Sequence, residues 1–159
     1  MTSKPFTTCL WFDTQGEEAA NFYTSIFKNS KITSISRYTS AGPRPEGTVQ
    51  TVEFELNGQQ FLALNGGPEH KPNPAFSIVV ECADQAEVDY YWDRLTEGGQ
   101  EIVCGWLADR YGFCWQIVPS VFLEMLRDPD QAKVARVTAA MFTMKKFDIA
   151  ALTEAYNAG

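Results

Sequence analysis

The sequence predicts an α+β protein made of two paired βαβββ modules, which form a curved mixed sheet with a cleft, followed by a helical tail. The main observation is that the order strand, helix and three strands occurs twice, in residues 1–68 and 75–119. A shift of 69 positions, which takes Ala19 to Val88, lays the apolar face of the first predicted helix on that of the second without a gap. One module alone would expose a sheet face, so we expect two modules to enclose a cleft.

The first module begins with a β-rich segment, Thr7 to Phe12, which predicts a strand. Thr14 and Glu17 then have the spacing of a capping box that starts a helix. The apolar face of this helix has the spacing i, i+3, i+4 and i+7, at Ala19, Phe22, Tyr23 and Ile26. Three strands follow, at Lys31–Thr39, Thr48–Leu56 and Gln60–Leu64, and the hairpin signal Asn57-Gly58 joins the last two.

The second module repeats this order after a connector with two prolines. Ala75 to Cys82 predicts a strand, and Asp84 with Glu87 predicts a helix start. The apolar face of the helix is again at i, i+3, i+4 and i+7, at Val88, Tyr91, Trp92 and Leu95, and Gly98-Gly99 ends the helix. Three short strands complete the module, at Glu101–Cys104, Trp106–Ala108 and Phe113–Val118.

Residues 120–159 change character and predict helices only. Asp128-Pro129-Asp130 and Asp148 are expected to begin two of these helices, because they combine N-cap residues with a first-turn proline or an apolar run. We interpret the apolar Val and Met stripe of this tail as a packing surface, which folds on the sheet or on a partner subunit.

The composition excludes several classes of partner. The chain of 159 residues has a net charge of −7 and no basic cluster, so neither nucleic acid nor an anionic membrane surface is an expected partner. No apolar run approaches the ~20 residues that a membrane span needs, and the start of the sequence is too short and polar for a signal peptide. We therefore expect a cytoplasmic globular protein.

The four cysteines are widely spaced and contain no CxxC pair, and the sequence has one histidine, His70. A zinc site built from a local motif is therefore not expected. Disulfides are not expected in a cytoplasmic protein, so we predict four reduced thiols.

The most informative stretch runs from Cys104 to Pro119. Asp109 and Gly112 fit the first and fourth positions of a type I turn, which makes the stretch a hairpin. Its second strand alternates, with Trp115 and Ile117 on one face and Gln116 on the other. An amide among large apolar side chains either satisfies a buried backbone group or faces a ligand.

The motifs of the chain resemble those of the vicinal oxygen chelate superfamily, and most closely its PhnB-like branch, which is labelled 3-demethylubiquinone-9 3-methyltransferase. The residues that carry the resemblance are Gly16–Tyr23, Asn65–Pro68, Phe76-Ser77 and, above all, Cys104–Pro119. The resemblance implies a divalent metal held by His and Glu side chains on strands of both modules. It places these ligands at Thr8, Asn65, Ser77 and Gln116, none of which is a His or a carboxylate. We therefore expect no metal and no other cofactor. Methyl transfer is not expected either, because the sequence lacks a Gly-rich turn in a doubly wound sheet.

The expected ligand-binding residues are these four together with two neighbours: Gln116, Ser77, Asn65, Thr8, Trp106 and Cys104. The alternative is that the polar side chains satisfy strand ends and each other, and for Asn65 that it serves turn chemistry. Cys104 lacks a nearby base in sequence, which favours an inert thiol over a nucleophile.

The expected function is the binding of a small organic ligand in a metal-free cleft by a homodimer. The alternative is a metal-independent enzyme on a small organic substrate of quinone-like or aromatic type. Its catalytic residues are unknown, and the acid or base candidates are Cys104, Glu81, Asp109 and Tyr111.

Overall fold

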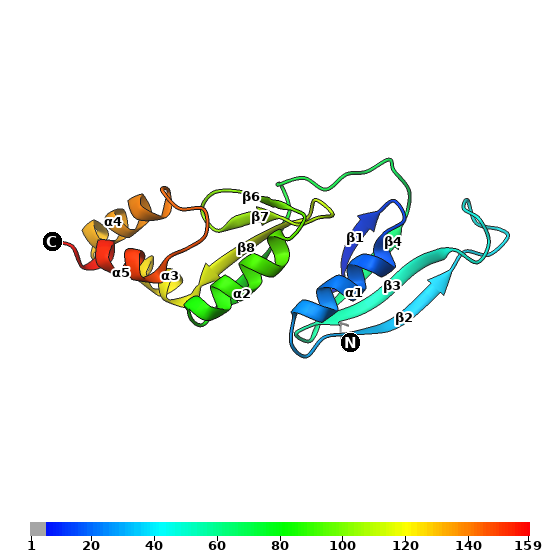
Figure 1. Ribbon diagram of the computed structural model, residues 1–159, viewed down its shortest axis with the longest axis horizontal. Coiled ribbons are helices and arrows are strands. Elements are labelled where there is room, and N and C mark those ends of the chain that lie inside the picture. The colour runs from blue at the N-terminus through cyan, green and yellow to red at the C-terminus, as the bar shows by residue number, and fades with distance from the viewer. Residues whose placement is uncertain (1–5) are drawn as a thin grey trace, which may run out of the picture. The chain divides into compact units, whose positions relative to one another are not determined.

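The computed structural model of the chain describes residues 6–159, and the first five residues of the polar start lie outside this range. The chain divides into two compact units, Met1–Lys71 and Pro72–Gly159. Each unit contains one four-stranded mixed sheet and a helix packed on it (Figure 1). The two units are called the first and the second module below.

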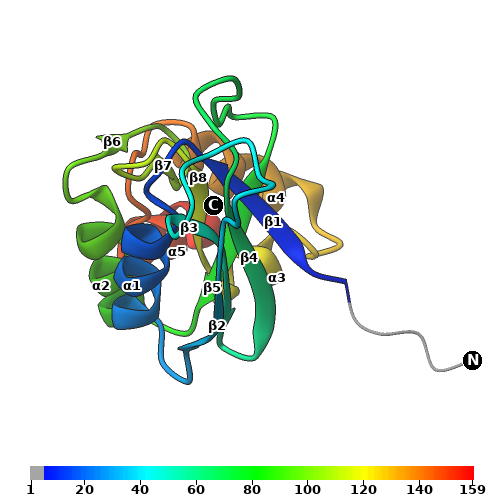
Figure 2. The same ribbon diagram turned by 90° about the vertical axis from the view of Figure 1, so that its right-hand side faces the viewer.

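The first module has the predicted order of elements. They are β1 (Thr8–Phe12), α1 (Gly16–Ile26), β2 (Lys31–Arg37), β3 (Val49–Leu56) and β4 (Gln59–Asn65). The sheet order is β1-β4-β3-β2, with β1 parallel to β4 and the other pairs antiparallel. Helix α1 lies along one face of this sheet (Figure 2) and buries Tyr23 against Phe54, which in turn stacks on Phe61. The burial of these rings provides the apolar core that holds helix and sheet together.

The second module repeats the arrangement. Its elements are β5 (Ser77–Cys82), α2 (Gln85–Thr96), β6 (Gln100–Glu101), β7 (Trp106–Ala108) and β8 (Cys114–Pro119). The sheet order β5-β8-β7-β6 is that of the first module, again with one parallel pair, β5 and β8. Helix α2 covers one face through Val88, Trp92 and Leu95, all of which are buried. The predicted fold class, two βαβββ modules, is confirmed.

The two sheet helices start in different ways. At α2 the predicted cap is confirmed, because the Asp84 side chain accepts a hydrogen bond from the Glu87 amide at 2.9 Å. At α1 the predicted capping box of Thr14 and Glu17 is wrong. Instead, the backbone amide of Gly16, the first residue of the helix, donates a hydrogen bond to Asn65 Oδ1 at the end of β4, at 2.8 Å. A Cβ atom on Gly16 would lie only 2.8 Å from that oxygen, so the contact requires glycine.

The tail forms three helices and belongs to the compact unit of the second module. They are α3 (Ser120–Met125), α4 (Gln131–Met141) and α5 (Ile149–Asn157). Asp148 caps α5, as predicted. The cap of α4 is Asp130 and not Asp128, so Pro129 precedes the helix and is not in its first turn.

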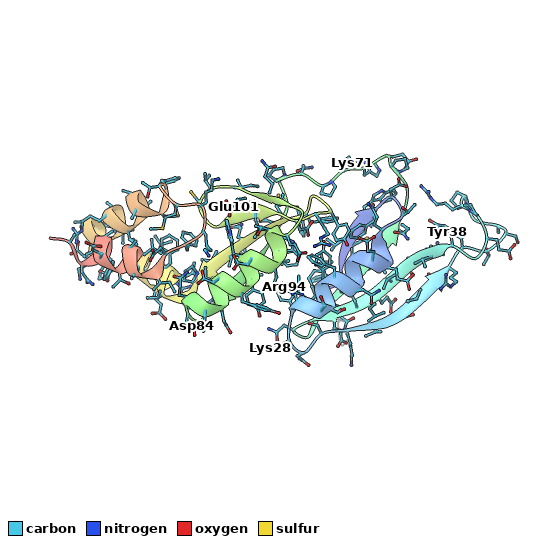
Figure 3. The ribbon with its side chains drawn as sticks, in the orientation of Figure 1. Lys28, Tyr38, Lys71, Asp84, Arg94 and Glu101 are labelled. Carbon is cyan, nitrogen blue, oxygen red and sulfur yellow. The ribbon has the colours of Figure 1, made fainter. Side chains whose placement is uncertain are left out.

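Helix α2 holds the tail through the amide of Gln85 and through ion pairs from Lys146 to Asp89 and Asp93. Gln85 donates to the Phe147 carbonyl at 3.0 Å and accepts from the Ile149 amide at 2.9 Å. Lys146 pairs with Asp89 at 2.8 Å. Figure 3 marks Asp84 at the start of α2, the end of the helix at which these contacts lie. Within residues 6–159, no helix has the length and apolar character needed to cross a membrane.

Candidate functional site

The sheet of the second module has one face against α2 and one face opposite. Trp115, Ile117 and Leu107 are buried on the α2 side, which confirms the predicted alternation of β8. We call the opposite side the open face of the second module. By strand register it carries Ser77, Val79 and Glu81 of β5, Cys114, Gln116 and Val118 of β8, Trp106 and Ala108 of β7, and Gln100 of β6.

Gln116 lies in the middle of the open face. Its register neighbours are Val79 on β5 and Trp106 on β7. Its Nε2 atom donates a hydrogen bond to Ser77 Oγ at 2.9 Å, and both side chains are half-buried. The structure therefore brings together three of the predicted ligand-binding residues, Gln116, Ser77 and Trp106. Within the described part of the chain, the side chains of Gln116 and Ser77 make no further hydrogen bond.

Trp106 differs from the other tryptophans of the chain in its indole N–H. The indole N–H of each of the other three donates a hydrogen bond of 2.8 to 3.0 Å. Trp11 donates to the Gly67 carbonyl, Trp92 to the Glu101 carboxylate and Trp115 to the Asp109 carboxylate. Among residues 6–159, the Trp106 N–H has no such acceptor. A half-buried indole normally finds a partner for its N–H, so Trp106 offers a ring and a donor beside Gln116.

Asp109 has a structural role that its exposed fraction of 3% makes plain. Its carboxylate accepts from the amides of Tyr111 and Phe113, at 2.9 and 3.1 Å, and from the Trp115 indole at 2.8 Å. Its carbonyl accepts from the Gly112 amide at 2.9 Å, which is the hydrogen bond of the predicted turn. Because the carboxylate is buried and bonded to three donors, it fixes the hairpin and is poorly placed to exchange protons with a substrate.

Cys104 lies in the turn between β6 and β7. Cys104 and Gly105 have φ angles of +58° and +78°, the combination that a two-residue type I′ hairpin turn requires. Their amides donate to the carbonyls of Met144 and Lys145 at 2.8 and 2.7 Å, so the turn also docks the tail. This backbone role accounts for the position of Cys104 without a reactive thiol.

The electrostatic surroundings of the two buried thiols also disfavour thiolate chemistry. Burial, with the carboxylates of Glu87, Asp84 and Glu81, raises the pKa of Cys82 to about 12. Burial and the Asp109 carboxylate raise the pKa of Cys114 as well. Both thiols are therefore protonated at neutral pH, and a protonated thiol is a poor nucleophile.

Thr8 and Asn65 lie on the α1 side of the first module's sheet. Thr8 is in register with Phe61, and Asn65 with Phe12, both of which are buried under α1. Asn65 is only 5% exposed, and its Nδ2 atom donates to the Val49 carbonyl at 3.1 Å while its Oδ1 atom serves the start of α1. The amide of Asn65 is thus committed to the fold, but through the start of α1 and the Val49 carbonyl of β3 and not through the turn that follows it.

Aligning the two modules on their helices pairs Thr8 with Ser77, yet the two residues lie on different faces of their sheets. Three residues separate β1 from α1, at 13–15, whereas two separate β5 from α2, at 83–84. The shift of 69 that superposes the helices therefore misplaces the strands by one, and the strand ends Phe12 and Cys82 correspond by a shift of 70. Because strand side chains alternate, one residue moves a side chain to the other face.

We also call the sheet face opposite α1 the open face of the first module. With the strands aligned by the shift of 70, each module has a matching row of three residues in register on its open face. The first module has Cys9, Leu62 and Glu53 in register across β1, β4 and β3. The second has Val79, Gln116 and Trp106 across β5, β8 and β7. Sequence reasoning missed Val79, which is 56% exposed, although the period of two along β5 was sufficient to place it beside Gln116.

The donor chemistry of the Gln116 and Ser77 pair does not fit a divalent metal ion. Both groups are neutral, and first-row metals in proteins rely on imidazole, thiolate or carboxylate ligands. The hydrogen bond between them also occupies one lone pair of the serine oxygen. Within the described residues, no group of three or more His, Cys, Asp or Glu side chains is placed to hold a metal.

A hollow in the second module lies between α2 and the tail, away from the residues of the open face. It is lined by Gln85, Asp89, Lys146, Phe147, Asp148, Ile149 and Ala150. Its polar groups bond to one another, through the Gln85 contacts and the Lys146–Asp89 ion pair. This arrangement fits a seam that holds the tail in place.

Comparisons with known proteins agree with the fold and with the motifs of the sequence. The profile of the family described as 3-demethylubiquinone-9 3-methyltransferase matches residues 4–118. A structure described as a putative 3-demethylubiquinone-9 3-methyltransferase, PhnB protein, from Bacillus cereus is 39% identical, with a TM-score of 0.67, and the match covers 74% of this chain and 100% of that one.

Two more distant structures share the fold alone. Protein PA1353 from Pseudomonas aeruginosa is 17% identical, with a TM-score of 0.61, over 74% of this chain and 98% of its own. The fosfomycin resistance protein FosX from Listeria monocytogenes, described as complexed with Mn(II) and sulfate ion, is 15% identical, with a TM-score of 0.55, over 80% and 98%. No protein with a curated description matches the chain. Because the family profile spans most of the chain and the PhnB protein is similar over its whole length, this chain belongs to the family described as 3-demethylubiquinone-9 3-methyltransferase, within the vicinal oxygen chelate superfamily.

Proposed function

We propose that this protein binds a small organic molecule on the open face of the second module, through Gln116, Ser77 and Trp106 and without a metal ion. The observation that carries the proposal is the hydrogen-bonded pair of Gln116 and Ser77 beside a tryptophan whose N–H has no acceptor in the described chain. Binding sites for small molecules combine apolar surface with a few placed polar groups. The open face has this combination.

The alternative is that the polar pair serves only the fold, and the hydrogen bonds of Gln116 support it less well. A structural amide such as Asn65 uses both its oxygen and its nitrogen within the module. Gln116 uses its nitrogen alone and reaches only another polar side chain, so its removal would leave no backbone group unsatisfied. The exposed apolar surface of Val79 beside it has no structural role in its own sheet.

The name of the family is a label, and we do not infer methyl transfer from it. Enzymes that bind nucleotide-like cofactors in α/β folds use a parallel, doubly wound sheet with a Gly-rich turn after a strand. The two sheets of this chain are mixed, with a single parallel pair in each. Small-molecule binding agrees with both the family and the open face.

The direct test identifies the molecule that the protein carries. Native mass spectrometry of the full chain, purified without denaturation, should detect a small-molecule adduct that the Gln116→Leu variant loses. The matched control is Gln100→Leu, the same change on the same face but on the exposed edge strand β6, and it should keep the adduct. An adduct that both variants keep would contradict a site at Gln116.

The absence of a metal from the site has its own test. FosX is described as complexed with Mn(II), whereas the site proposed here consists of an amide and a hydroxyl. Elemental analysis of protein purified without chelator or added metal should find no stoichiometric transition metal. One ion per chain would contradict the proposal.

A second candidate, a metal-independent enzyme, is favoured by one observation. Glu81 lies on the open face, two residues after Val79 on β5, and its carboxylate is a candidate general base near the ligand. If the carried molecule is turned over, Glu81→Gln should abolish turnover and keep binding. Unchanged turnover would remove Glu81 from this role.

We also propose that the protein is a homodimer. Its tail exposes apolar side chains, with Phe142 at 68% and Leu126 at 38%, and β5 is an edge strand of its own sheet. Sedimentation velocity at micromolar concentration should show a species of twice the chain mass. A purely monomeric profile would contradict this part of the proposal.

A further inference from the structure

We infer that the ligand is an uncharged flat molecule that carries a hydrogen-bond donor and a hydrogen-bond acceptor on neighbouring atoms, as a ring-bound primary carboxamide does. The inference rests on the proposed function and names the chemical class that the open face would select. It follows from the hydrogen-bond capacity, the charge and the dimensions of the row that contains Gln116.

The hydrogen-bond capacity of the pair leaves an acceptor beside free donors. The bond from Gln116 Nε2 to Ser77 Oγ leaves the Gln116 Oε1 atom as an acceptor, and it leaves the second Nε2 hydrogen and the Ser77 hydroxyl proton as donors. If the amide is turned by 180°, the hydroxyl donates to Oε1, and the pair then offers an amide N–H and a serine lone pair. Either orientation presents a donor beside an acceptor, and a carboxamide satisfies both.

The charge of the open face disfavours an anionic ligand. Glu81 is acidic, and the other eight open-face positions named above hold neutral side chains. A carboxylate ligand would have no cationic partner among these residues, and it has no donor for the acceptor that the pair leaves. The free Trp106 N–H adds a further neutral donor.

The dimensions of the row favour a flat ring system. Val79, Gln116 and Trp106 lie on three adjacent strands, so the outer two are about 9.5 Å apart at the usual strand spacing. An exposed valine and an indole ring at this separation match the apolar faces of a two-ring aromatic system whose polar substituent reaches the central amide.

The experiment compares three probes that share one ring system: 2-naphthamide, methyl 2-naphthoate and sodium 2-naphthoate. The amide has a donor and an acceptor, the ester has acceptors only, and the naphthoate is an anion. Isothermal titration calorimetry with the full chain should show the amide binding about tenfold more tightly than either of the others, because an unpaired polar group costs about 1.4 kcal/mol or more.

Variants assign this preference to the pair. Gln116→Leu should bring the three affinities within about twofold of each other, since apolar ring contacts remain, whereas Gln100→Leu should keep the tenfold preference. Ser77→Ala, a change at a half-buried position at the start of β5, provides a second variant if Gln116→Leu fails to fold.

The outcomes separate the inference from the proposed function. Equal or tighter binding of the ester or of the naphthoate overturns the inference and leaves a binding site in place. A preference for the amide that survives both Gln116→Leu and Ser77→Ala also overturns it. If none of the probes binds but another molecule perturbs Trp106 fluorescence in a fragment screen, only the inference fails. If no fragment perturbs Trp106, the proposed function fails too.

Discussion

The two modules have the same topology and use their polar side chains differently. In the first module the amide at the end of β4, Asn65, is buried on the helix side and bonds to the backbone at both ends. In the second module the amide of β8, Gln116, lies on the open side and bonds only to Ser77. The position of Gln116 corresponds to Leu62 in the first module, because each lies in the central row of its open face.

The open faces of the two modules also differ in how their polar side chains are paired. On the first module's open face, polar groups pair with one another: Lys31 with Glu55 at 3.7 Å, Gln60 with Glu55 at 2.5 Å, and Ser36 with Thr51 at 2.6 Å. On the second module's open face, the described polar contact is the pair of Gln116 and Ser77, beside Trp106. The comparison teaches that two copies of one topology can differ in how many polar groups of the open face are paired with one another.

The largest expected effect is at the hairpin that ends each module. The first module turns at Asn57-Gly58, where both φ angles are positive, and the second relies on the Asp109 carboxylate. Asp109→Ala should lower the free energy of unfolding by about 4 kcal/mol, because it leaves buried N–H groups without acceptors. Asn57→Gly should change it by less than about 1 kcal/mol, because glycine adopts the positive φ readily. Urea denaturation measures both, and similar effects would contradict the contrast.

The next effect tests the two amides. Asn65→Ala should cost about 2 kcal/mol, because the first amide of α1 and the Val49 carbonyl lose their partner. Gln116→Ala should cost less than about 1 kcal/mol, because it removes only one half-buried side-chain bond. A larger cost at Gln116 than at Asn65 would assign the structural amide to the second module.

Thiol reactivity provides a smaller contrast. Cys9 is exposed on the first module's open face, whereas Cys82 and Cys114 are buried in the second. Burial raises the pKa of all three thiols, so the difference in exposure sets the expected order. In the native protein, a thiol reagent at neutral pH should modify Cys9 well before Cys82 and Cys114. Peptide mapping by mass spectrometry after short exposure measures the order, and early modification of Cys82 would contradict the buried environment described here.

The smallest expected effect is a pH dependence of two contacts that involve the tail. A hydrogen bond from Tyr156 lowers the pKa of Asp128, and one from Lys146 lowers the pKa of Asp89. A carboxyl group whose pKa is lower in the folded state adds stability above its unfolded pKa, about 3.9, and this stability is lost as the pH falls through the folded value. Thermal unfolding should therefore show a decrease in Tm below about pH 4 that is smaller in Asp128→Asn. An equal decrease in both proteins would exclude Asp128 as a contributor.

Much of the fold could be predicted because the spacing of apolar residues along the sequence indicates helices and strands. The apolar faces of both sheet helices and the hairpin at Asn57-Gly58 were found where they were predicted. The start of α1 could not be predicted from neighbouring residues, because its partner, Asn65, lies 49 positions away. A local capping rule was correct at α2, where Asp84 is adjacent, and wrong at α1.

Part of the candidate site could also be predicted from the sequence, namely the positions of Gln116 and Ser77. The alternation of β8 placed Gln116 away from the core, and the repeat placed Ser77 near it, as the 2.9 Å hydrogen bond confirms. Thr8, which the family resemblance placed in the site, lies on the α1 side of its sheet. The loop between β1 and α1 has one residue more than the loop between β5 and α2, which moves Thr8 to the opposite face from Ser77.

The sequence by itself determined the two βαβββ modules, the helical tail and the face of β8 that carries Gln116, since each depends on periodic patterns and turn residues within a short segment. Only the tertiary structure decided which of the two amides serves the fold. Asn65 and Gln116 are both polar residues on β-strands, and the difference between them is the backbone that another segment brings within hydrogen-bonding distance. A side chain's partners across 49 residues are set by packing, which no local pattern records.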